Sequence, residues 1–247
     1  MRLVTTDAIV LRSYNLAESD RIVVCLTRSS GLVRAVAKGA RRMKSRFGAA
    51  LEPYTLIKLS FHERENRDLV TMSGAEILKS NFNLSTNDES SEVLAYMGEM
   101  VAEFAPPHET DECLFRMLTA CVEVLAQQRG AERTLTRYFE IWLLRLAGLF
   151  PDFRACASCG TAIDQAASAA VDLELRPYCK NCNPGNAWIL APDVVNIIRA
   201  SHQLSPSKFA SQHSLTERQY VEIGDLTHRM ITRAIDRRPR TLVASTR

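Results

Sequence analysis

The chain has 247 residues, of which 46% are apolar and 24% charged, and its formal net charge is +3 at pH 7. This composition suits one large or two smaller globular domains and excludes disordered, collagen-like and low-complexity chains. Its apolar stretches fall far short of the roughly 18 residues of a membrane span, and Asp7 interrupts what would be the apolar part of a signal peptide. We therefore expect a soluble protein of the reducing cytoplasm with no membrane partner.

The first 80 residues predict strands, because short runs rich in Val, Ile, Leu and Thr alternate with turn residues at close spacing. We expect five strands, at residues 6–13, 21–28, 32–38, 54–62 and 69–77. Five short strands in this length favour a closed or nearly closed antiparallel sheet, and a five-stranded OB-type β-barrel is the expected fold. We assign residues 1–80 to this domain.

Helical periodicity begins after a polar, turn-rich stretch at residues 80–91, where we place a domain boundary. The apolar residues from Leu114 to Leu125 have the i, i+3, i+4, i+7 spacing of an amphipathic helix. We also expect helices at residues 93–104 and 135–149, one that begins near Pro192, and a last one over residues 220–231. Ser214 and Glu217 have capping-box spacing before that last helix, although Gly224 interrupts its run. Residues 81–247 then form a helical domain, and the fold class is α+β.

Four of the seven cysteines stand in two C-x-x-C pairs that nineteen residues separate. They are Cys156, Cys159, Cys179 and Cys182. Two such pairs are typical of a four-thiolate zinc site, with redox pairs or surface thiols as the alternative. Four thiolates leave no position for water or substrate, so we expect the zinc to be structural, in a module of about residues 154–185.

Basic residues concentrate near the N-terminus: residues 1–80 carry 14 basic and 8 acidic side chains, whereas residues 81–150 carry 5 and 11. The densest segment holds five cations in nine residues, namely Lys38, Arg41, Arg42, Lys44 and Arg46. These cations repel one another, and an anionic partner would relieve the repulsion. On an OB-type barrel such a loop is expected to bind the phosphates of nucleic acid, with a merely solvated loop as the alternative.

Phe47, Tyr54 and Phe61 lie close to this segment, and we expect one of them to stack on bases, although strand aromatics are more often core. Three further cysteines, Cys25, Cys113 and Cys121, are expected to be core or near-core thiols, and the five histidines to be structural or at the surface. The sequence holds no nucleotide-binding, hydrolase or metalloprotease motif. We expect no catalytic residues.

Three stretches of the sequence resemble a known family. They are Tyr14 to Val23 (YNLAESDRIV), Gly31-Leu32 leading into the Lys38-Gly-Ala-Arg-Arg run and Ser45-Arg46, and Leu51-Glu52-Pro53-Tyr54. The layout of the helical region and its cysteine pairs agrees. The chain thus resembles, over nearly its whole length, the bacterial RecO family of recombination mediators and DNA-repair proteins.

The resemblance implies an OB-fold domain, a helical domain with an embedded zinc module, binding of single- and double-stranded DNA, annealing of complementary strands, and no enzymatic activity. It implies a nucleoid-associated place in the cytoplasm. The implied partners are RecR, the C-terminal tail of single-strand-binding protein and, indirectly, RecA. The tail would dock on the helical domain, where Arg133, Arg137 and Arg145 are candidate cations. The alternatives are a zinc-containing nucleic-acid-binding regulator of transcription or RNA and a nucleic-acid-processing enzyme.

Overall fold

The computed structural model describes residues 2–16, 18–63, 69–105, 109–163 and 167–241. The chain forms two compact units, one over residues 1–127 and one over residues 128–243. Among the helices of the described residues, none combines the length and the hydropathy that a bilayer crossing requires.

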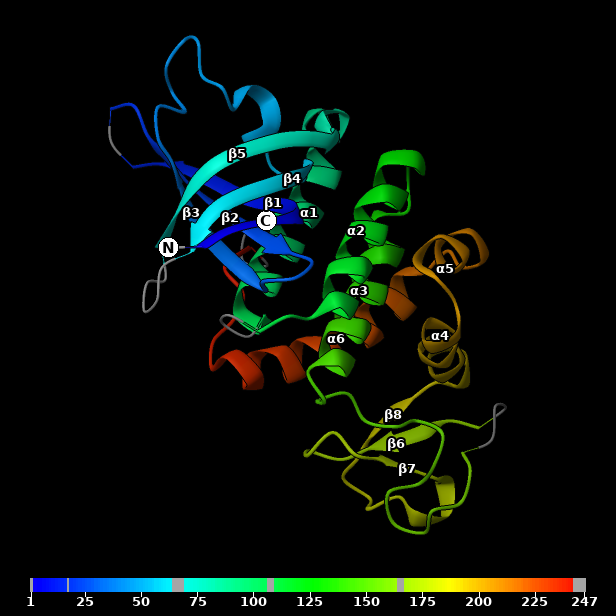
Figure 1. The fold of residues 1–247 in the computed structure, drawn as a ribbon. Coiled ribbons are helices and arrows are strands. Elements are labelled where there is room, and N and C mark those ends of the chain that lie inside the picture. The colour runs from blue at the N-terminus through cyan, green and yellow to red at the C-terminus, as the bar shows by residue number, and fades with distance from the viewer. Residues whose placement is uncertain (1, 17, 64–68, 106–108, 164–166, 242–247) are drawn as a thin grey trace. The chain divides into compact units, whose positions relative to one another are not determined.

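Five strands of the first unit close into a barrel (Figure 1). They are β1 (Arg2–Asn15), β2 (Arg21–Thr27), β3 (Leu32–Ala37), β4 (Leu56–Glu63) and β5 (Leu69–Lys79). Their order is β1-β2-β3-β5-β4, and β4 pairs back with β1. The five strands and the OB-like ring confirm the prediction, except that β3 and β5 run parallel. β1 exceeds its predicted bounds because its first half pairs with β4 and its second half with β2.

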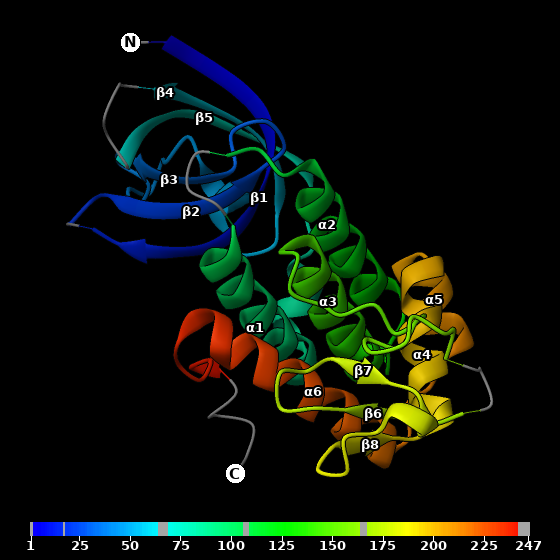
Figure 2. The same cartoon turned by 90° about the horizontal axis from the view of Figure 1, so that it is seen from below.

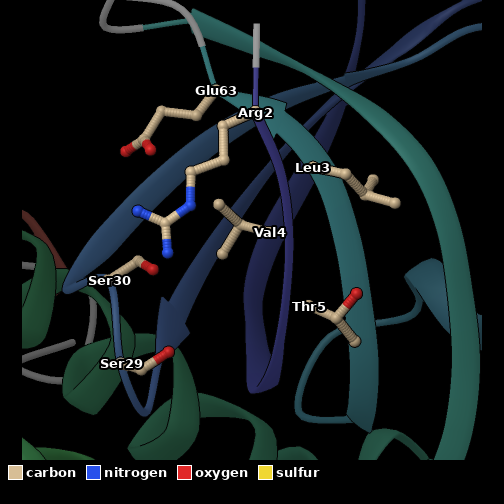
Figure 3. A pocket seen from close by; sticks show the side chains of 7 residues that line it. All are labelled: Arg2, Leu3, Val4, Thr5, Ser29, Ser30 and Glu63. Carbon is tan, nitrogen blue, oxygen red and sulfur yellow. The ribbon is translucent and has the colours of Figure 1, made fainter.

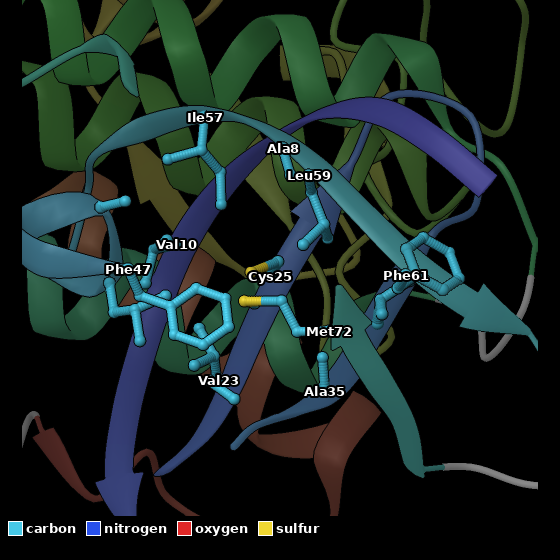
Figure 4. Close-up of a cluster of buried hydrophobic side chains, with 14 residues drawn as sticks. Ala8, Val10, Val23, Cys25, Ala35, Phe47, Ile57, Leu59, Phe61 and Met72 are labelled. Atoms are coloured by element: carbon cyan, nitrogen blue, oxygen red, sulfur yellow. The ribbon is translucent and has the colours of Figure 1, made fainter. Parts of the chain in front are cut away.

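Side chains that point inward from all five strands fill the barrel (Figure 4). Small residues, among them Ala8 and Ala35, leave room for the rings of Phe47 and Phe61. Cys25 lies fully buried in the same cluster, and burial raises the pKa of its thiol to about 12. The prediction of Cys25 as a core thiol is confirmed.

A β-bulge in β1 changes the direction in which its side chains point. Val10 lies opposite Cys25, and both belong to the core, whereas the register shifts before Arg12. Leu11 is the extra residue, and side chains of a strand otherwise alternate between its two faces. Arg12 and Tyr14 are exposed as a result, although they are an even number of residues from the buried Val10.

Two helices complete the first unit. They are α1 (Asp88–Phe104) and α2 (Glu112–Gln127), and the unit also holds the short 3-10 segments η1 (Gly48–Leu51) and η2 (Phe82–Thr86). The side chain of Asn87 caps α1 by accepting hydrogen bonds from two backbone N–H groups of the first turn. Tyr54 fixes α1 to the barrel, because its hydroxyl donates to the carbonyl of Leu94. Both helices confirm the predicted periodicity.

The second unit holds four helices and a small sheet among its described residues (Figure 2). They are α3 (Glu132–Leu146), α4 (Pro192–Gln203), α5 (Pro206–Gln212) and α6 (Glu217–Ile235), the 3-10 segment η3 (Lys180–Cys182), and the strands β6 (Ala169–Val171), β7 (Pro177–Tyr178) and β8 (Trp188–Leu190). The sheet order is β7-β6-β8, with both pairs antiparallel. Neither α5 nor this sheet was predicted from the sequence.

Two predicted helix ends in this unit are wrong. α3 ends at Leu146 and not at residue 149, because Gly148 takes the left-handed conformation (φ +71°) that commonly ends a helix. The capping box of α6 is formed by Thr216 and Gln219, and not by Ser214 and Glu217. The side chain of each residue accepts a hydrogen bond from the backbone N–H of the other. The two boxes have the same spacing, so the sequence alone does not separate them.

A buried charge network joins α3 to α6. Arg137 donates to both carboxylate oxygens of Glu140 at 2.7–2.8 Å, and Thr227 and His228 approach the same carboxylate at 2.6 and 3.0 Å. Burial alone would raise the pKa of Glu140, but the charges of Arg137 and His228 and the hydrogen bonds lower it to about 2. A Cβ on Gly224 would clash with the Arg137 guanidinium. This contact explains the glycine inside α6.

Candidate nucleic-acid interface and metal centre

The basic segment forms a loop between β3 and η1, which we call the basic loop (residues 38–46) (Figure 1). Its five cations are all exposed, and so is the side chain of Met43 in its middle. The cations are Lys38, Arg41, Arg42, Lys44 and Arg46. Because no acidic residue interrupts the loop, its surface attracts anions.

The turn between β1 and β2 holds the first half of the basic loop. The carboxylate of Asp20 accepts the backbone N–H of Gly39 at 2.8 Å and the hydroxyl of Ser19 at 2.9 Å. The carbonyl of Ser19 accepts the backbone N–H of Arg41 at 3.0 Å. The Gly39 hydrogen bond, with that of Ser19, lowers the pKa of Asp20. Gly39 has φ +70°, a conformation that favours glycine.

The barrel core holds the other end of the loop. The ring of Phe47 is buried among the core side chains, and the guanidinium of Arg46 lies over it at 4.9 Å from the ring centroid. The loop is thus anchored at both ends while its cations stay in solvent. Asp20 and Ser19 are positioning residues that the sequence analysis did not identify. The signal in the sequence was Asp20 itself, because no other acidic residue follows it before Glu52.

The predicted stacking aromatics are buried, which corrects that expectation. Phe47, Tyr54 and Phe61 are 3%, 8% and 1% exposed. Phe47 and Phe61 fill the barrel, and Tyr54 contacts α1 through Leu94. A small barrel fills its interior with its large apolar side chains, so none of the three rings is available to stack on a base.

The three candidate arginines of the helical region differ in their surroundings. Arg137 belongs to the buried network with Glu140, so its expected surface role is wrong. Arg133 is half-buried, forms an ion pair with Glu217, and lies over an aromatic ring. Arg145 is exposed and lies over the ring of Trp142, 4.9 Å from its centroid.

The four paired cysteines converge on one point beside the small sheet. Their sulfur atoms all lie within 4.8 Å of one another, and Sγ of Cys159 and Cys179 are 3.9 Å apart. Zinc–sulfur bonds of about 2.3 Å in a tetrahedron place sulfurs about 3.8 Å apart, so the cluster fits a metal ion such as zinc. The backbone N–H groups of Cys179 and Cys159 lower the pKa of the Cys156 thiol to about 6, whereas side-chain hydrogen bonds with Cys159 and Cys179 raise the pKa of Cys182 to about 12.

Ion pairs and carbonyl contacts hold the segment around this cluster. Arg154 pairs with Asp152, and Arg176 pairs with Asp172. Arg199 of α4 donates to the carbonyls of Phe153 and Ile163. A surface hollow of about 400 Å³ lies beside the sulfurs and includes the exposed Lys180 in its lining.

The remaining cysteines separate into two groups. Cys121 is fully buried, and burial raises its pKa, which confirms it as a core thiol. Cys113 is exposed, so its expected core position is wrong. It lies in the first turn of α2, one residue before the buried Leu114, on the side of the helix away from the apolar stripe.

A second surface pocket (Figure 3) includes the β2–β3 turn, whereas the basic loop follows the other end of β3. It has a volume of about 420 Å³ and is lined by the first residues of β1, by Ser29 and Ser30 of the β2–β3 turn, and by Glu63. Arg2 lies opposite Glu63 in the β1–β4 pairing, so both signs of charge share the pocket rim. The pocket does not extend the basic surface.

Comparison with known proteins matches both parts of the chain to one family. Residues 1–81 match the family described as Recombination protein O N terminal, and residues 90–242 match Recombination protein O C terminal. A DNA repair protein RecO of Koribacter versatilis (strain Ellin345) is 33% identical over 162 residues, 66% of this chain and 66% of the relative. A DNA repair protein RecO of Anaeromyxobacter sp. (strain K) is 34% identical over 186 residues, 75% of this chain and 72% of the relative.

Proposed function

Because the chain belongs to the RecO family of DNA repair and recombination proteins, we propose that it is a recombination mediator that binds single- and double-stranded DNA and anneals complementary strands. It acts without catalysis. Its surface lowers the repulsion between two phosphate backbones, and base pairing then drives annealing. We place this work in the cytoplasm, in association with the nucleoid.

The observation that carries the proposal is the basic loop. Five exposed cations stand on a backbone that is anchored at both ends, to the β1–β2 turn and to the barrel core. A loop of this kind follows a phosphate backbone without reading its sequence. We therefore assign DNA binding to residues 1–80, which form the barrel of the first unit.

Annealing of two labelled complementary oligonucleotides coated with single-strand-binding protein, without nucleotide, tests this function. The loop variant replaces Lys38, Arg41 and Arg42 by Ala. The matched control replaces Arg116, Arg129 and Lys208, which are exposed cations outside the barrel, and changes the net charge equally. We expect the wild type and the control to anneal and the folded loop variant to fail. Wild-type protein that leaves coated strands unpaired would refute the proposal and favour a nucleic-acid-binding regulator.

We further propose that the four-cysteine cluster holds a structural Zn²⁺. The support is the donor set and the sulfur spacing of Cys156, Cys159, Cys179 and Cys182. When bound, the ion cross-links the two cysteine pairs and supplies folding free energy to a segment with little regular structure. The four side chains fill the coordination tetrahedron, so their role is to hold the module together.

The proposed protein partners are RecR, the acidic tail of single-strand-binding protein and, indirectly, RecA. For the tail we favour the surface around Arg145 and Trp142, since an exposed cation over a half-buried aromatic ring suits a peptide with both acidic and apolar residues. Titration with a tail peptide tests this placement. We expect Arg145→Ala to weaken binding and Arg129→Ala to leave it unchanged; unchanged affinity in both would reject the site.

A further inference from the structure

We propose that the ring of Tyr14 is the base-stacking residue of the barrel and gives it a preference for single-stranded over double-stranded nucleic acid. The proposal rests on the proposed DNA binding and adds to it a contact with unpaired bases. The basic loop supplies contacts to phosphate, which are the same in both kinds of strand. A preference for single strands needs a different contact, because bases are accessible only where they are unpaired.

Tyr14 is the barrel aromatic that burial leaves available. Residues 1–80 contain four aromatic side chains, all of them described by the structure. Three are at most 8% exposed, whereas Tyr14 is 46% exposed. The bulge at Leu11 turns Tyr14 away from the core that Val10 enters. Without that extra residue, strand alternation would place the ring inside the barrel.

The position of Tyr14 relative to the basic loop suits one continuous strand. Tyr14 lies opposite Ile22 on β2, and Ile22 lies opposite Val36 on β3, so the three side chains share the outer face of the barrel. Val36 is two residues before Lys38, where the basic loop begins. Two strand spacings put Tyr14 about 10 Å from Val36, and the two residues from Val36 to Lys38 add about 7 Å along the strand, so the ring and the loop lie within reach of two or three nucleotides.

The surroundings of the ring add charge and apolar surface. Arg12 on β1 and Arg34 on β3 are both exposed, and both lie opposite Val24 of β2, about 7 Å along the strands from the Tyr14 row. A phosphate next to a stacked base, on the Val24 side of the ring, would meet these guanidinium groups. Ile22 and Val36 are half-buried and extend an apolar surface from the ring across β2 to β3. The face therefore has a stacking ring, apolar neighbours and flanking cations, which is the arrangement that single-strand binding uses.

Two oligonucleotides of equal length separate stacking from charge. One is a labelled oligo-dT, and the other carries abasic sites throughout, so that its phosphates are the same and its bases are missing. Affinities come from fluorescence anisotropy with the full chain. The variants are Tyr14→Ala, Tyr14→Phe, and the control Leu16→Ala, which removes a neighbouring side chain that is 42% exposed. Circular dichroism and urea midpoints establish that each variant is folded.

We expect Tyr14→Ala to weaken oligo-dT binding by at least about fivefold, the lower end of measured base–aromatic stacking, and to change abasic binding less than about twofold. Tyr14→Phe and Leu16→Ala should match the wild type on both. Equal loss on both oligonucleotides, no loss on either, or the same loss with Phe would overturn the stacking role and leave the basic-loop function intact. Wild-type protein that binds neither oligonucleotide would refute the proposed function, and the stacking role with it.

Discussion

Salt dependence gives the basic loop a quantitative prediction. Binding to a single strand releases about 0.7 counterion per neutralised phosphate, so five loop cations predict a slope of log affinity against log salt of about −3.5 or steeper. Replacing Lys38, Arg41 and Arg42 by Ala removes three of the five. The slope should become shallower by about 2, because all three side chains are exposed and can each reach a phosphate.

The assay is fluorescence anisotropy of a labelled oligo-dT titrated with protein at five or six salt concentrations. The control variant with Arg116, Arg129 and Lys208 replaced by Ala has the same net charge and should keep the wild-type slope. An unchanged slope in the loop variant would refute the argument that these cations neutralise phosphates. Equal flattening in both variants would show that net charge, and not this loop, governs binding.

Three further predictions concern the second unit. Arg137→Met should lower the free energy of unfolding in urea by about 3–5 kcal/mol, because it leaves Glu140 buried without its ion-pair partner. Adding Glu140→Leu should recover part of this loss. A double variant that is less stable than Arg137→Met alone would contradict the reasoning. The folded pKa of Glu140 is about 2 and its ordinary value is 4.5, so its ionised form stabilises the fold above about pH 4.5, and this contribution is lost as the pH falls toward 2. The stability advantage of the wild type over Glu140→Gln should therefore shrink between pH 5 and 3. A constant difference would exclude Glu140 as the source of the pH dependence. Metal analysis should find about one zinc per wild-type chain and much less in Cys159→Ser. Cys113→Ser is the control and should keep the wild-type zinc content, because Cys113 lies outside the cluster. Equal zinc content in all three proteins would reject the site.

Local sequence patterns predicted the elements of the barrel well because each strand is short, apolar and bounded by turn residues. What they missed depends on long-range pairing. The bulge at Leu11 leaves the composition of β1 unchanged, yet it decides that Arg12 and Tyr14 face solvent. Burial of Phe47 and Phe61 likewise follows from barrel closure, which no local window contains.

The metal cluster was the part of the site that sequence predicted best, since ligand type and spacing alone restrict four thiolates to one geometry. The anchors of the basic loop were invisible for the opposite reason. Asp20 meets Gly39 from nineteen positions away, and the bond is to a backbone N–H that every residue type except proline offers. Arg137 shows the same limit: its helix pattern suited an exposed cation, and only the packing of α3 on α6 buries it against Glu140.

The way the basic loop is anchored explains why it should bind DNA without reading sequence. Asp20 and Ser19 hold the loop through the backbone N–H groups of Gly39 and Arg41. Fixing the main chain places the positive charge on one surface, while long side chains keep the rotamer freedom to follow an irregular phosphate path. Such contacts do not distinguish a single strand from a duplex by base chemistry. Discrimination must therefore come from a fixed surface beside the loop, and the outward ring of Tyr14 is the aromatic that the barrel leaves there.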